Sequence, residues 1–102
     1  MAVGMLQAWE GFTKKMYDDI TEKMFGHTPM RDEDSPEGLI VHSAGQSHAG
    51  WYVYDIWESR EAFERFMNDQ LMPAVGEVMG DQQPPEEARP QFFEVEVLVM
   101  GR

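Results

Sequence analysis

The sequence has 102 residues, no cysteine and a formal net charge of −11, so a single domain over residues 1–102 with one modest core is expected. Such an acidic surface repels nucleic acid and anionic membranes, and no apolar stretch approaches the roughly 20 residues that cross a bilayer. The missing cysteines exclude disulfides, and the N-terminal residues lack a signal-peptide pattern, so we expect a cytoplasmic protein.

The first part of the chain reads as a strand, a helix and a loop. Residues 3–9 alternate loosely and predict a strand. Thr13 can cap a helix over 13–25, where apolar residues recur at helical spacing, and Gly26 can end it. The polar, proline-containing stretch 26–37 predicts a loop.

Residues 38–58 predict a β-hairpin. Strands over 38–45 and 50–58 flank a turn at 46–49. This turn sets an antiparallel register that places His42 opposite Val53, and Ile40 opposite Asp55.

A second helix and a fourth strand complete the chain. Ser59 caps a helix with a long apolar stripe that ends at Gly80, and Pro73 predicts a kink or break near 69–73. A proline-rich loop over 81–90 leads to a strand over 91–99.

The element order β-α-β-β-α-β predicts an α+β, ferredoxin-like fold: a four-stranded antiparallel sheet with two helices on one face. The hairpin is nevertheless apolar on both faces, with Trp51, Val53 and Trp57 on one side and Tyr52, Tyr54 and Ile56 on the other. An antiparallel sheet that faces water should carry polar residues on its free side. We therefore expect a homodimer in which two sheets pack face to face.

The run GLIVHSAGQSHAGWYVYDIWESREAFERF over 38–66 resembles the dimeric α+β barrel superfamily, and most closely the antibiotic-biosynthesis-monooxygenase-like proteins. The likeness extends from Met5 to Val99, and DIWESREAFERF is its most specific part. It implies a homodimer whose sheets form one barrel, with a small-molecule cavity between sheet and helices in each subunit. Some members of the family oxygenate aromatic substrates without metal or flavin, and others bind and degrade haem.

The family's known sites are only partly present. Trp57 matches the tryptophan that follows the third strand and lines the cavity, but Val53 stands where the aromatic-oxidising members carry Asn. Haem-degrading members need an Asn on the first strand and a His on the second helix. The single Asn of this chain, Asn68, lies on the second helix, and that helix has no His. We expect no haem site and no cofactor.

His42 and Asp55 are the predicted catalytic pair. In the expected register they are diagonal neighbours on one face, where a carboxylate would fix the tautomer of the imidazole and raise its basicity. Such a pair can act as a general base toward a phenol or an activated C–H, and Tyr17 could add a hydroxyl from the first helix. Alternatively, Asp55 pairs with Arg60 or Arg65 and only anchors the fold.

The predicted substrate-binding residues share the aromatic face of the hairpin or the adjacent helices, and Trp57 could equally be core packing. They are Trp57, Tyr17, Trp51, Val53 and Phe63. His42, His48 and Asp55 lack the tight spacing of a metal site, so no metal is expected.

Two functions remain open at this level. One is a cofactor-free oxygenase or related proton-transfer enzyme that acts on an apolar or aromatic small molecule. The other is a non-catalytic dimer that binds an apolar ligand or a partner protein. An enclosed pocket reached by both His42 and Asp55 would favour the enzyme, and a filled core would favour the second interpretation.

Overall fold

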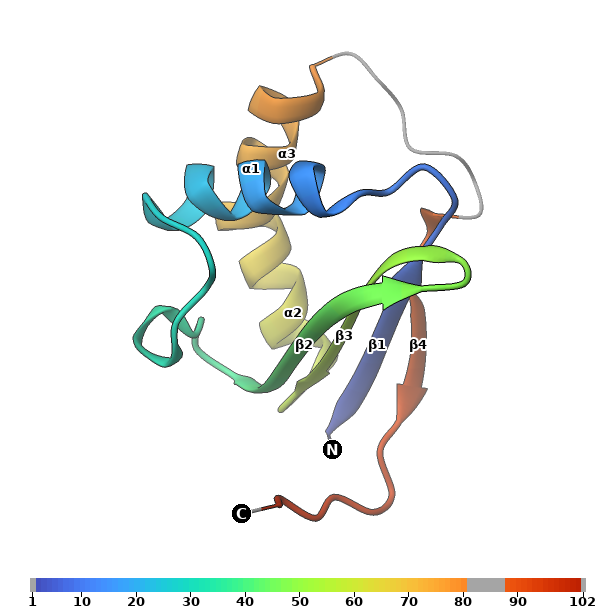
Figure 1. Cartoon of the computed structure of the whole chain (residues 1–102). Helices are drawn as coiled ribbons and strands as arrows, with labels where there is room; N and C mark the ends of the chain where they lie inside the picture. The colour runs from blue at the N-terminus through green and yellow to red at the C-terminus, as the bar shows by residue number, and fades with distance from the viewer. Residues whose placement is uncertain (1, 81–87, 102) are drawn as a thin grey trace.

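A four-stranded antiparallel sheet with helices on one face forms the fold of the computed structural model, which describes residues 2–80 and 88–101 (Figure 1). The strand order is β2-β3-β1-β4, and this arrangement confirms the predicted ferredoxin-like fold. In chain order the elements are β1 (Val3–Ala8), α1 (Lys14–Phe25), a short 3-10 turn η1 (Asp32–Asp34), β2 (Leu39–Ser47), β3 (Gly50–Trp57), α2 (Arg60–Phe66), a π-helical segment η2 (Met67–Leu71), α3 (Met72–Met79) and β4 (Gln91–Glu94).

The hairpin between β2 and β3 is tighter than the sequence predicted. Its strands pair up to Ser47 and Gly50, and His42 lies directly opposite Asp55 rather than opposite Val53. The expected register was wrong by two residues because the connection has two residues instead of four. An even shift keeps every side chain on its face, so His42 and Asp55 still lie on the same side of the sheet.

Both long helices begin at the predicted caps. The Thr13 side chain accepts from Met16 N, and the Ser59 side chain accepts from Ala62 N. The predicted irregularity before Pro73 takes the form of the π-helical segment η2, after which α3 continues to Met79. Proline lacks a backbone donor, so a widened turn ahead of it costs little.

The fourth strand is shorter than predicted. It ends at Glu94 instead of residue 99, because its only neighbour, β1, pairs with it no further than Val3. Val95 N donates one more backbone hydrogen bond, to Ala2 O. Residues 96–101, which follow, are not part of a strand. Most of the predicted loop over 81–90 lies outside the described residues.

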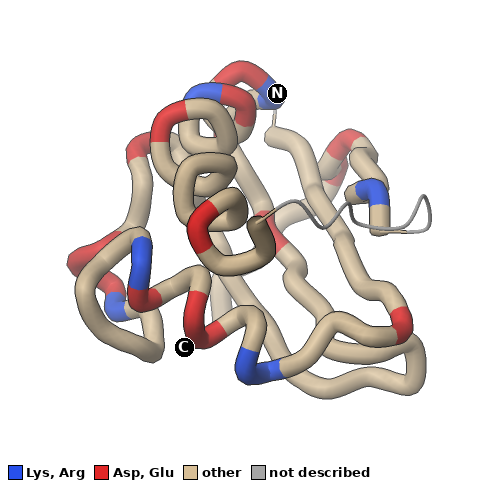
Figure 2. The backbone as a smooth tube through the Cα atoms, turned by 90° about the horizontal axis from the view of Figure 1, so that it is seen from above, with Lys and Arg blue, Asp and Glu red and all other residues tan. Residues whose placement is uncertain are grey.

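Two apolar clusters pack between the sheet and the segments that cover it. One centres on Met5, Trp57 and Phe63, and the other on Trp9 and Phe12. Charged residues gather on helices and loops, whereas the strands carry few of them (Figure 2). Within the described part of the chain, no helix is both long and apolar enough to cross a membrane.

Candidate active site

The carboxylate of Asp55 is buried beneath the helices, with 5% of the residue exposed. His42 Nδ1 lies 2.7 Å from Asp55 Oδ1, and Trp57 Nε1 donates a 3.2 Å hydrogen bond to Oδ2. An unpaired buried carboxylate is expensive, so these two donors make the charged residue compatible with an aromatic strand. Strand geometry places both donors beside Asp55, because Trp57 follows it by two residues on the same face and His42 lies directly opposite on β2.

Hydrogen bonds at both ring nitrogens define the neutral tautomer of His42. An ionised carboxylate can only accept, so Nδ1 carries the proton and donates to Asp55. Nε2 is then an acceptor and takes the hydroxyl hydrogen of Tyr17, at an O···N distance of 2.5 Å. A continuous hydrogen-bond chain therefore runs from the Tyr17 hydroxyl through His42 to Asp55.

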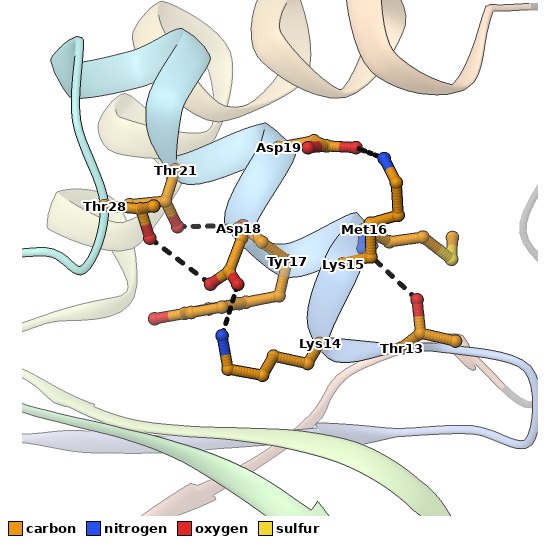
Figure 3. A network of polar contacts seen from close by, with 9 residues as sticks. All are labelled: Thr13, Lys14, Lys15, Met16, Tyr17, Asp18, Asp19, Thr21 and Thr28. Carbon is orange, nitrogen blue, oxygen red and sulfur yellow. Dashed lines mark hydrogen bonds and ion pairs between the residues drawn. The ribbon is translucent and has the colours of Figure 1, made fainter.

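Tyr17 projects from α1 and reaches His42 on β2, while Lys14 and Asp18 on the same helix form an ion pair beside its ring (Figure 3). Its ring lies 6.0 Å from that of His42, with an interplanar angle of 8°. Burial raises the pKa of the Tyr17 phenol to about 12, and the negative charge of Asp55 acts in the same direction. The phenol is therefore protonated near neutral pH and acts as a donor.

A cavity of about 410 Å³ separates the sheet from the helices, and Tyr17, His42 and Asp55 form part of its wall. This volume falls within the roughly 300–1,000 Å³ that is typical of small-molecule sites. Most of the remaining wall is apolar, and methionine contributes strongly to it. Because its side chain is flexible, methionine lets a wall adapt to a ligand. The methionines that line the cavity are Met5, Met24, Met30, Met67, Met72 and Met79.

The other predicted substrate-binding residues fall into two groups. Trp57, Val53 and Phe63 line the cavity, and Trp57 also packs edge-on against Phe63 with ring centroids 5.7 Å apart. Trp51 packs instead against Tyr17, at 5.6 Å between centroids, and does not line the cavity. Its indole nitrogen is buried without a hydrogen-bond partner among the described residues.

Neither arginine that could have anchored Asp55 is its partner. Arg60 lies over the ring of Phe92, 3.7 Å from the centroid, and its Nε lies 3.6 Å from Glu64. Within the described residues, Arg65 forms no ion pair with Asp55.

The sequence interpretation missed two features of the site. The first is the hydrogen bond from Trp57 to Asp55, which the spacing of two residues on one strand could have suggested. The second is Gln7 on β1, which lines the cavity and donates from Nε2 to the carbonyl oxygen of Ala88 at 2.6 Å. No local signal marks that contact, because its partners lie 81 residues apart in the chain.

The three histidines lie in different parts of the fold. Both ring nitrogens of His42 are already hydrogen-bonded, His27 pairs with Asp34 in the loop after α1, and His48 lies in the hairpin turn. The chain has three histidines, so α2, η2 and α3 carry none. Across residues 2–80 and 88–101, no cluster of three or more His, Asp or Glu side chains could hold a metal ion.

The sheet and its covering helices define an α+β protein of the ferredoxin-like class. The particular likeness is to antibiotic-biosynthesis-monooxygenase-like structures, which confirms the predicted resemblance at the level of the fold. No model of a protein family matches the sequence, and neither does any curated protein.

Three solved structures carry this comparison. A candidate antibiotic biosynthesis monooxygenase from Chloroflexus aurantiacus is 16% identical with a TM-score of 0.59, over 99% of this chain and 98% of that one. A haem-degrading protein from Mycobacterium tuberculosis is 18% identical with a TM-score of 0.55, over 98% of this chain and 100% of that one. A variant of MhuD with two manganese protoporphyrin IX molecules bound per active site is 22% identical with a TM-score of 0.52, over 99% of this chain and 100% of that one.

The tautomer of His42 is directly testable. Long-range ¹H–¹⁵N correlation spectra of the neutral imidazole should show a protonated Nδ1 and an unprotonated Nε2. In Asp55→Asn the side chain offers one accepting oxygen for two donors, so the free energy of unfolding should fall by about 1–3 kcal/mol. The resonances of His48, in the hairpin turn, provide the internal reference. An Nε2-protonated His42 in the unaltered protein would contradict the assigned hydrogen-bond chain.

The raised pKa of Tyr17 predicts a pH-dependent stability. The folded-state pKa of about 12 exceeds the ordinary value of 10.0, so the protonated phenol is favoured by folding. Relative to Tyr17→Phe, the unaltered protein should therefore hold its full stability advantage below pH 10.0 and lose it as the pH rises toward 12. Urea unfolding of both proteins across this window measures the difference, in which all other titrating groups cancel. A difference that does not change with pH would mean that the phenol ionises as freely as in the unfolded chain.

Proposed function

We propose that this protein is a small-molecule enzyme that removes a proton from an apolar or aromatic substrate, as the first step of a cofactor-independent oxygenation. The observation that carries the proposal is the hydrogen-bond chain from Tyr17 through His42 to Asp55, which reaches a partly open, mainly apolar cavity. A buried base with an orienting carboxylate is a common arrangement for proton abstraction. The names of structures with the same fold, a candidate monooxygenase and haem-degrading proteins, support oxygenation as the reaction class.

The chain can move a proton without forming a free phenolate. An acidic O–H or activated C–H of the substrate approaches the Tyr17 oxygen and gives it a proton, while Tyr17 passes its own proton to His42 Nε2. The imidazole becomes an imidazolium, which the Asp55 carboxylate stabilises through the 2.7 Å contact at Nδ1. The pKa of about 12 makes an isolated Tyr17 phenolate unfavourable, so the transfer to His42 is coupled to the transfer from the substrate.

The substrate leaves this step as an anion in a mainly apolar cavity. Such an electron-rich anion can react with dioxygen, which is the oxidant that the proposed oxygenation requires. Trp57 holds the second oxygen of Asp55, and this bond fixes the direction of the carboxylate toward His42. The apolar wall favours uncharged aromatic compounds. The net charge of −11 acts in the same direction, because it repels anionic substrates.

The alternative function is ligand binding without catalysis. The methionine-rich wall favours it, since a flexible apolar cavity can carry a ligand without any chemistry. A filled core would have favoured this alternative; the cavity, with His42 and Asp55 on its wall, supports the enzyme instead.

A homodimer is the proposed state of the protein. Its support is the outer face of the sheet, where Leu6 is 38% exposed, Phe93 is 42% exposed and Tyr54 stacks on Phe93. The apolar segment 97–100 beyond β4 is exposed too. Charged residues are scarce on the strands, so two copies can bring these faces together without opposing like charges (Figure 2).

Proton transfer can be measured with anthrone, an apolar three-ring ketone with acidic methylene protons. Under anaerobic conditions in D₂O, the protein should accelerate deuterium exchange at that methylene, as followed by NMR. With air admitted, oxygen uptake should accompany anthraquinone formation. Tyr17→Phe and His42→Gln should each lower the exchange rate by about 10²- to 10⁴-fold, the usual contribution of a positioned acid or base.

Tyr52→Phe is the matched control, because Tyr52 bonds to Ser43 on the outer face and should not affect exchange. If anthrone binds but Tyr17→Phe and His42→Gln exchange as fast as Tyr52→Phe, the catalytic proposal fails and ligand binding becomes the better function.

Sedimentation equilibrium at micromolar concentration should give twice the chain mass of 11.8 kDa. Leu6→Glu places a charge on the exposed outer face and should give monomers, because desolvating that carboxylate against a second sheet is costly. Gln46→Glu adds the same charge at an exposed position near the hairpin turn and should leave the dimer intact. A monomeric unaltered protein would remove the basis for a barrel of two sheets.

A further inference from the structure

Gln7 holds its side-chain amide in one orientation. Its Nε2 lies 2.6 Å from the carbonyl oxygen of Ala88. A carbonyl oxygen only accepts hydrogen bonds, so the NH₂ group must face Ala88 and Oε1 must point elsewhere. Ala88 is 2% exposed and belongs to the cluster of Trp9 and Phe12, which fixes the partner in place.

Oε1 of Gln7 has no hydrogen-bond partner among the residues that the structure describes. The other polar side chains on the cavity wall are already occupied. Both oxygens of Asp55, both ring nitrogens of His42 and the hydroxyl of Tyr17 take part in the chain described above, and the Thr21 hydroxyl donates to a backbone carbonyl. Gln7 therefore offers a ligand an acceptor that no neighbouring side chain is using.

This acceptor lies at a distance from the proton-transfer chain. Gln7 pairs with Val53 on β3, two residues from Asp55, and Asp55 in turn pairs with His42 on β2. Two strand spacings and an offset of two residues place the backbones of Gln7 and His42 about 12 Å apart. The apolar side chain of Val53 lies on the cavity wall between them.

We propose that Gln7 determines substrate specificity: its Oε1 accepts a hydrogen bond from a hydroxyl or amino group at the far end of an elongated aromatic substrate. The acidic end of the same molecule meets Tyr17, so this inference rests on the proposed function and names its substrate class. That class is fused-ring aromatic compounds with a hydrogen-bond donor at each end. A carboxylate at the far end would face the lone pairs of Oε1 and be rejected.

A set of naphthalene ligands tests the proposal by isothermal titration calorimetry. The probes are naphthalene-2,6-diol, which has a donor at each end, 2-naphthol, which has one, and 6-methoxy-2-naphthol, which matches the length of the diol but lacks the second donor. The unaltered protein should bind the diol about 3- to 10-fold more tightly than either other probe, the contribution of one neutral hydrogen bond. In Gln7→Met the three affinities should converge to within about twofold.

Gln46→Met replaces an exposed glutamine near the hairpin turn and should preserve the preference for the diol. The comparison among ligands corrects for general damage, because a loosened fold weakens all three probes together. If Gln7→Met does not fold, the affinities of the unaltered protein for the diol and for 6-methoxy-2-naphthol still test whether the second donor strengthens binding. Equal binding of the diol and its methyl ether, a preference that persists in Gln7→Met, or no binding of any probe would each overturn the inference.

The two proposals can fail separately. If the preference for the diol is absent while anthrone exchange still depends on Tyr17, the role of Gln7 falls and the proton-transfer function stands. If the preference depends on Gln7 but anthrone exchange does not depend on Tyr17 or His42, the donor-recognition site is supported and the catalytic function falls.

Discussion

The carboxylate of Asp55 must be paired because it lies out of water, and the arrangement around it follows from that requirement. One oxygen takes the imidazole of His42 across the hairpin, and the other takes the indole of Trp57 along the same strand. The first bond sets the tautomer of His42 and turns Nε2 toward Tyr17 on α1. The second keeps Trp57 oriented against Phe63, within the main apolar cluster. A single buried charge thus links the hairpin, the first helix and the core.

The cavity combines a rigid wall with an adaptable one. The sheet side carries the paired polar groups, which are held by strand register and by hydrogen bonds. The helix side carries Met24, Met67, Met72 and Met79, whose thioether chains can change conformation at little cost. In the proposed reaction, such a division would hold the reacting end of a substrate in one place and accommodate its apolar body with more tolerance.

The sequence was sufficient to predict the element order and which side chains of the hairpin share one face of the sheet. Alternation along β3 placed Val53, Asp55 and Trp57 together, and this conclusion survives any register error of an even number of residues. The pairing register of β2 with β3 could not be predicted, because the stretch 46–49 fits a four-residue turn as readily as the two-residue connection that forms. The fourth strand was predicted too long because its apolar alternation continues past Glu94, whereas pairing depends on where β1 begins.

The contact of Gln7 with Ala88 shows a different limit of prediction from sequence. Its amide partner, Ala88, is 81 residues away, and nothing in the local pattern of β1 distinguishes Gln7 from a glutamine on a solvated strand. The Trp57–Asp55 bond, in contrast, could have been anticipated from spacing alone. Contacts between neighbours on one strand are readable from sequence, and contacts that depend on how distant segments pack are not.

The π-helical segment Met67–Leu71 has a consequence for how such a cavity can change over evolution. A π-helical turn accommodates one residue more than an α-helical turn, and each residue turns an α-helix by about 100°. Losing one residue here would restore a regular helix and leave Met72, Val75 and Met79 facing the cavity, because the wider turn absorbs the extra residue. A one-residue deletion in this segment would thus change only the part of the cavity wall near Met67 and Leu71, while α3 and the sheet that carries Asp55 keep their places.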